Sequence, residues 1–212
     1  MRGAFIGAAA IVLALPVSAS AHRLDEYLQA ARVSLERTDV FLEIDLTPGA
    51  SVADDIIALI DRDNDDRISP HEARAYAERV LADVVVELDG RLVAMTLERV
   101  EAPSTGEMRH GMGAVQLRAV GNVQAAAIWR RQRQLHFTNN HHAASSVYLV
   151  NALLPTDAGV SVVSQTRDAK QREARIEYTV TPQWAGYVYG PLVGLVVGGW
   201  WLKARAKPNA RR

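Results

Sequence analysis

The chain has 212 residues, 49% of them hydrophobic and 23% charged, which is ordinary for a globular protein and leaves room for one domain or two small ones. The absence of cysteine excludes disulfides, thiolate metal sites and cysteine nucleophiles. The formal net charge is zero, but residues 22–183 carry 18 basic against 24 acidic side chains, a net charge of −6, which suits divalent cations better than nucleic acid.

Residues 1–21 have the pattern of a secretory signal peptide. Arg2 provides the charged start, Ala4 to Leu15 is an apolar run, and Ala19-Ser20-Ala21 is a small-x-small cleavage site. The alternative is an uncleaved anchor, but this run is too short to cross about 30 Å of hydrocarbon comfortably. We therefore expect export, with the following domain periplasmic or extracellular and His22 as its first residue.

Residues 24–46 alternate apolar and polar side chains, which predicts two strands with one buried face and a turn over 36–39. Two helices are expected next, over about 51–60 and 70–82, because their apolar residues recur at helical spacing. Ser51 can cap the first helix, and Pro70 is favourable at the start of the second.

Strands are expected again over 84–88 and 92–100, joined by the hairpin signal Asp89-Gly90. A loop follows over 102–113. Further strands are predicted at 114–120, 134–138, 146–151, 160–166 and 175–180. The cluster of Arg130, Arg131 and Arg133 is interpreted as a solvated edge. The expected fold class is α+β: a mostly antiparallel β domain over 22–183, interrupted by a helix–loop–helix over 50–82.

The segment between the two predicted helices, residues 61–72, reads DRDNDDRISPHE and matches the twelve-residue EF-hand loop. Such a loop supplies oxygen ligands from its first, third, fifth, seventh, ninth and twelfth positions, the seventh through its backbone carbonyl. The ligand positions are occupied by Asp61, Asp63, Asp65, Arg67, Ser69 and Glu72. Calcium is a hard cation that takes about six to eight oxygens, so the predicted bound ion is Ca²⁺.

The sixth loop position is Asp66, where glycine is usual because the chain turns there with positive φ. Aspartate tolerates that conformation at a cost of about 1 kcal/mol, so we expect weak affinity, roughly 10⁻⁴–10⁻³ M. Ile68, at the eighth position, is expected to point inward. No second hand is visible, so this one is expected to pack on the sheet domain or to pair across a dimer. The alternative is an acidic, solvated turn.

The histidines could form a second metal site. His22 would offer an imidazole and a free amine to copper or nickel, and His141 and His142 could join His110 or His136. The alternative is that these are ordinary polar residues. The sequence contains no nucleophile elbow, HExxH, phosphate-binding loop or dinucleotide fingerprint, so no enzymatic activity is expected.

Residues 184–202 contain no charge and, as a helix, would reach about 28 Å, which predicts one transmembrane helix and the lipid bilayer as a partner. The basic tail 203–212 is expected on the cytoplasmic side, so the localisation is single-pass in the inner membrane. A glycine every fourth residue could make a homodimer contact, although glycine is common in membrane helices. These glycines are Gly186, Gly190, Gly194 and Gly198.

The stretches HRLDEYLQA, EIDLTPG, the aspartate-rich loop, GEMRHGMGAVQLRA and SVYLVNALLP resemble the exported N-terminal domain of HupE/UreJ-type membrane proteins, over about residues 22–180. That family is linked to nickel or cobalt transport. The resemblance implies an exported domain with metal handling nearby and assigns no catalytic residue. This chain departs from the family because it offers one hydrophobic span in place of several, so any transport would need a membrane transporter as a partner.

The sequence thus predicts a membrane-anchored, exported calcium-binding module with a binding or scaffold role. The alternative is an accessory domain for nickel, cobalt or copper handling beside a metal transporter. Metal bound through His22 and the other histidines would favour the alternative, whereas calcium bound through the loop would favour the first function.

Overall fold

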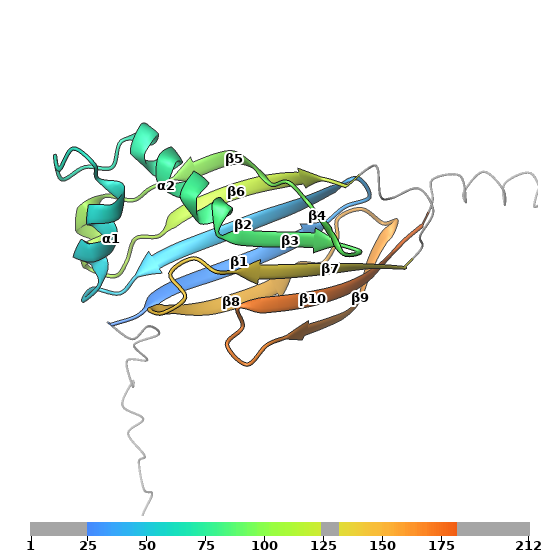
Figure 1. Ribbon diagram of the computed structural model, residues 1–212. Coiled ribbons are helices and arrows are strands. Elements are labelled where there is room, and N and C mark those ends of the chain that lie inside the picture. The colour runs from blue at the N-terminus through green and yellow to red at the C-terminus, as the bar shows by residue number, and fades with distance from the viewer. Residues whose placement is uncertain (1–24, 124–131, 182–212) are drawn as a thin grey trace, which may run out of the picture.

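Two five-stranded sheets make up most of the structure, a computed structural model that describes residues 25–123 and 132–181 (Figure 1). The first sheet has the order β5-β6-β2-β1-β8, formed by β5 (Thr96–Glu101), β6 (Val115–Asn122), β2 (Asp39–Pro48), β1 (Tyr27–Leu35) and β8 (Ser146–Ala152). The second has the order β4-β3-β7-β10-β9, formed by β4 (Arg91–Leu92), β3 (Val84–Leu88), β7 (Gln132–Asn139), β10 (Glu173–Val180) and β9 (Val160–Arg167). Neighbouring strands are antiparallel except β1 and β8, which are parallel.

The hydrophobic core contains side chains from both sheets. Burial alternates along β1 and β2, as the apolar–polar alternation predicted, so one face of each strand is buried. Leu42 and Ile44 from the first sheet and Phe137 and Ile176 from the second belong to one buried cluster. Each fully buried side chain of this size stabilises the fold by about 1.5–3 kcal/mol, so the shared core stabilises the packing of the two sheets.

Two helices follow β2 and lie at one end of the sheets, and the second runs along β5 toward β3 (Figure 1). Helix α1 (Ala53–Ile60) and helix α2 (Pro70–Ala82) bury the faces that helical spacing predicted. The N-cap of α1 is Val52, which makes no side-chain cap, so the predicted cap by Ser51 is wrong. A third helix, α3 (Thr105–Arg109), lies in the segment expected to be a loop.

The expected fold class is wrong. Strands account for 48% of the structure, and the three helices are short, so this is a mostly β fold of two sheets with a helical insertion. Within the described ranges, no helix is long and apolar enough to cross a membrane. The fold is mostly β because α1 and α2 have only 8 and 13 residues and bury their apolar faces in the same core as the strands. The helices therefore form no layer of their own.

Several sequence predictions concern residues that the structure does not describe. These are the signal peptide over 1–21, His22, the hydrophobic span over 184–202 with its glycines, and the basic tail over 203–212. The membrane helix that was part of the expected fold class is therefore no part of the fold seen here.

The strand predicted over 92–100 is divided between the two sheets. The hairpin turn at Asp89 and Gly90 forms as expected, with φ of 51° and 78°. The returning strand β4 pairs for only two residues before the chain crosses to β5 in the other sheet. The crossing passes over Gly121 of β6, where an added Cβ would lie 2.5 Å from Val93 Cγ1 and 2.7 Å from Met95 Sδ. Only glycine leaves room for this crossover.

Arg133 is a further departure from the sequence interpretation, because it is buried and not at a solvated edge. Its side chain has 0% exposure, and its Nε donates to Asp89 Oδ2 at 2.7 Å. The alternation of β7 places this position on the inner face of its strand. A buried cation needs such a carboxylate partner, which the charge pattern alone could not identify.

Candidate metal centre

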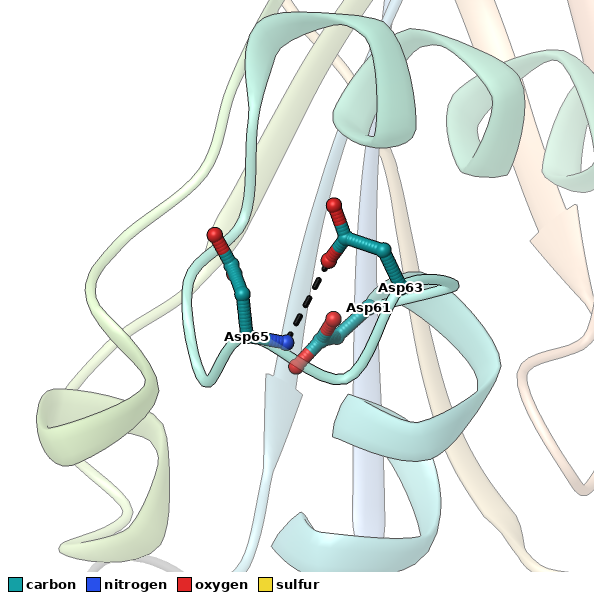
Figure 2. Close-up of side chains that lie close together, drawn as sticks. All are labelled: Asp61, Asp63 and Asp65. Atoms are coloured by element: carbon teal, nitrogen blue, oxygen red, sulfur yellow. Dashed lines mark hydrogen bonds between the residues drawn. The ribbon is translucent and has the colours of Figure 1, made fainter.

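The predicted loop connects α1 to α2 and brings three aspartates together. One carboxylate oxygen from each of Asp61, Asp63 and Asp65 lies within 4.8 Å of the others, and Figure 2 shows the three side chains gathered in the loop. Oxygens bound to one calcium ion at about 2.3–2.6 Å can lie no more than about 5.2 Å apart. The spacing therefore fits a shared ion of this size.

Asp61 holds a buried oxygen that lacks a hydrogen-bond partner. The residue is 6% exposed, and within the described part of the chain its Oδ1 receives no hydrogen bond. Its Oδ2 accepts from the backbone amide of Asp66 at 3.0 Å. Buried polar atoms are almost always paired, because leaving one without a partner is costly. A cation in the loop would supply the missing partner.

Backbone amides of the loop donate hydrogen bonds to carboxylates of the same loop. The amide of Asp65 donates to Asp63 at 3.3 Å, and the amide of Arg67 donates to Asp65 at 2.9 Å. Asp66 has φ of 63°, so the sixth position adopts the left-handed conformation that the sequence required of it, and Asn64 does the same with φ of 59°. The left-handed turns let successive amides point at the carboxylates while the chain doubles back.

The charges of the loop repel one another. The amide of Asp65 lowers the pKa of Asp63, but desolvation and the negative charges of Asp65 and Glu72 outweigh that effect, so the pKa of Asp63 is raised. A divalent cation would reverse this repulsion, because it favours the ionised form of every carboxylate around it.

Glu72 reaches back to the loop but is not grouped with the aspartates. Its Oε1 accepts from the Arg62 amide at 2.6 Å, and its Oε2 accepts from the Ser69 amide at 2.9 Å and the Ser69 hydroxyl at 2.7 Å. Ser69 caps α2 in return, so the two residues form a capping box. Donation from the Ser69 amide, followed by that from Arg62, lowers the pKa of Glu72 to about 2. The carboxylate is therefore ionised and close to the loop, but its oxygens are engaged.

Helix α3 covers the loop from outside. Thr105 Oγ1 donates to the Asp66 carbonyl at 2.9 Å, and the Arg109 guanidinium donates to the Asp66 carboxylate at 2.7 Å. Arg109 Nε also donates to Asp54 on α1 at 2.8 Å. Ile68 packs, half-buried, against the hydrophobic core. The loop segment is thus packed on the rest of its own domain. Pairing across a dimer stays a prediction.

Sequence reasoning did not identify α3 as part of this site. Its five residues are too few to show helical periodicity. A usable signal was present, because Ser104 and Glu107 form the capping box of α3 and have the Ser-x-x-Glu spacing that marks a helix start.

Among the described residues, His110, His141 and His142 form no group that could hold a metal ion, and His22 lies outside the described residues. Both ring nitrogens of His141 are engaged, Nδ1 with Asp83 at 2.8 Å and Nε2 with the Tyr76 hydroxyl at 3.1 Å. The ring of His142 packs edge-on against that of His141, whereas His110 Nδ1 contacts the Gly106 carbonyl on α3. In residues 25–123 and 132–181, the aspartate cluster is the only group of three or more metal-ligating residues.

Comparisons with protein-family models, curated proteins and solved structures find no match for this chain. The resemblance to the exported domain of HupE/UreJ-type proteins therefore stays a prediction. The loop itself supports a metal site through three grouped carboxylates and one buried oxygen without a partner.

Proposed function

We propose that residues 61–72 bind Ca²⁺ and that the protein is an exported calcium-binding module with a binding or scaffold role. The observation that carries this proposal is the buried Oδ1 of Asp61, which is unpartnered in the described structure and belongs to a residue grouped with Asp63 and Asp65. Oxygen-only ligands favour a hard cation over nickel or copper.

The remaining ligands would come from the rest of the loop. The Arg67 carbonyl and the Ser69 side chain occupy the seventh and ninth positions, and Glu72 occupies the twelfth. For Glu72 to bind the ion with both oxygens, it must exchange its bonds to the Arg62 amide and to Ser69. We therefore expect calcium binding to change the start of α2, where these bonds lie.

Calorimetry and thermal unfolding of the full chain test the proposal. For an affinity of roughly 10⁻⁴–10⁻³ M, about 10 mM calcium stabilises the protein by about 1.4–2.7 kcal/mol. For a domain of this size, that corresponds to a melting temperature about 3–10 °C higher than in chelator.

Asp61→Asn should abolish most of the calcium-dependent shift, because it removes the charge of the buried ligand. The matched control is Asp55→Asn, which makes the same charge change at an exposed position on α1 and should leave the shift intact. Identical melting of the wild-type protein in calcium and in chelator would contradict the proposal. Tight binding of nickel or copper in place of calcium would favour an accessory role in transition-metal handling.

A further inference from the structure

Asp66 is held at all three of its polar groups. Its amide donates to Asp61, its carbonyl accepts from Thr105, and its carboxylate accepts from Arg109. Thr105 and Arg109 are one helical turn apart on α3, and Thr105 is buried with 5% exposure. Helix α3 therefore hydrogen-bonds Asp66 from two of its residues, which lie about 40 positions away in sequence.

Asp66, which α3 contacts, is also the residue that departs from the usual EF-hand loop, where the sixth position is glycine. A φ of 63° at the sixth position is ordinary for glycine and unfavourable for aspartate, because the Cβ crowds the backbone. Contacts that exist only in this conformation offset that cost. The carbonyl bond to Thr105 and the carboxylate bond to Arg109 both depend on how the chain turns at Asp66.

Asp66 also connects α3 to the carboxylate of Asp61, a proposed calcium ligand. Asp66 donates its amide to Oδ2 of Asp61, and the other oxygen of Asp61 is the buried one without a partner in the described structure. Fixing Asp66 therefore fixes the orientation of Asp61. Arg109 also bonds Asp54, so α1, the loop and α3 meet at one guanidinium.

We propose that Thr105 and Arg109 are positioning residues that preorganise the calcium loop through Asp66, and this inference rests on the calcium binding proposed above. Preorganisation raises affinity because less ordering is left for the ion to impose. The contacts of α3 thus supply the support that glycine at the sixth position makes unnecessary.

The charge of Arg109 makes the proposal sharply testable. A positive charge near a cation site opposes binding, so electrostatics alone predicts tighter calcium binding when Arg109 is replaced by glutamine. Positioning predicts the opposite sign. Exposed ion pairs contribute little to stability by themselves, so the effect should appear in calcium affinity more than in the melting of the calcium-free protein.

The experiment measures calcium affinity by calorimetry, and calcium release by stopped-flow mixing with chelator, on the full chain. Arg109→Gln and Thr105→Val should each weaken binding about three- to tenfold and speed release, as expected for one lost hydrogen bond. Thr105→Ser keeps the hydroxyl and is the matched control, with affinity within about twofold of wild type. In an Asp66→Gly background, Thr105→Val should change affinity less than about twofold, because glycine adopts the turn unaided.

The outcomes separate the two proposals. If wild type binds calcium and Arg109→Gln binds it equally or more tightly, the positioning role is overturned and the calcium site stands. If wild type binds no calcium, the proposed function itself falls. Arg109 is partly exposed, with 40% of its side chain accessible, so its variant tests the proposal even if Thr105→Val fails to fold.

Discussion

His141 is the residue at which the helical insertion and both sheets are joined by hydrogen bonds. Its ring contacts Asp83 and Tyr76, and Tyr76 in turn bonds the Tyr27 hydroxyl at 2.7 Å. Its carbonyl accepts from Gln29 of β1 at 2.8 Å and from Tyr148 of β8 at 2.6 Å, both in the first sheet. Its amide donates to Asn139 Oδ1 of β7, in the second sheet, at 2.9 Å. With a neutral ring, Nδ1 can donate to Asp83 and Nε2 can accept from the Tyr76 hydroxyl, so the histidine acts as a buried structural link between the strands and α2.

Acid should weaken the fold through His141. Burial lowers its pKa below the usual 6.5, and although the hydrogen bond with Asp83 opposes this shift, the charges of His142 and Arg79 reinforce it. The unfolded state therefore takes up a proton first, so stability is complete above about pH 6.5 and falls as the pH drops toward the lower pKa of the folded state.

Urea unfolding in chelator, followed from about pH 7 to pH 5, should show this loss, with a slope of up to about 1.4 kcal/mol per pH unit. His141→Gln should be less stable at neutral pH but flatter across this range. The exposed His71→Gln serves as the control and should keep the wild-type profile. An unchanged slope in His141→Gln would rule out His141 as the titrating group.

At the scale of elements, α2 connects the loop to the histidine link. Glu72 lies in its first turn, Tyr76 contacts His141 from its middle, and Asp83 is its C-cap. The first turn of the helix thus carries a proposed calcium ligand, and its middle and C-cap contact the buried His141. A change at its first turn on calcium binding would act on an element that is already fixed at its other end.

The capping box of α2 should contribute measurably to stability without calcium. Ser69→Ala removes the side chain that accepts from the Glu72 amide and should cost about 0.5–2 kcal/mol in urea unfolding with chelator present. Ser51→Ala is the matched control, because Ser51 precedes α1 but does not cap it, and it should be nearly neutral. Equal losses in the two variants would show that the cap of α2 is not formed in solution.

At the scale of the whole molecule, the two sheets depend on a chain that changes sheets between β4 and β5. Gly121→Ala places a methyl group against Val93 and Met95 in this crossover and should destabilise the protein by about 1–3 kcal/mol. Gly106→Ala is the control, because the nearest atom to its Cβ would be 4.0 Å away and alanine favours the helix. Thermal unfolding of both variants measures the difference, and a neutral Gly121→Ala would mean that the crossover yields without cost.

Local patterns in the sequence were sufficient for most strands, both helices of the insertion and the loop between them. The alternation over 24–46 became β1 and β2, and the spacing of 61–72 was enough to bring Asp61, Asp63 and Asp65 together. These features were predictable because strand alternation, helical periodicity and loop ligands depend on residues within about one turn or one strand of each other.

Only the tertiary structure decided which distant segments meet. It paired β1 with β8 in parallel, buried Arg133 against Asp89 and divided 92–100 between two sheets. It also placed α3 against Asp66, the contact on which the positioning proposal depends. The sequence alone determined that an aspartate-rich loop with EF-hand spacing lies between two helices, because the residues of the loop are close neighbours in the chain. The support for that loop comes from residues about 40 positions away, and only folding of the whole domain brings them into contact.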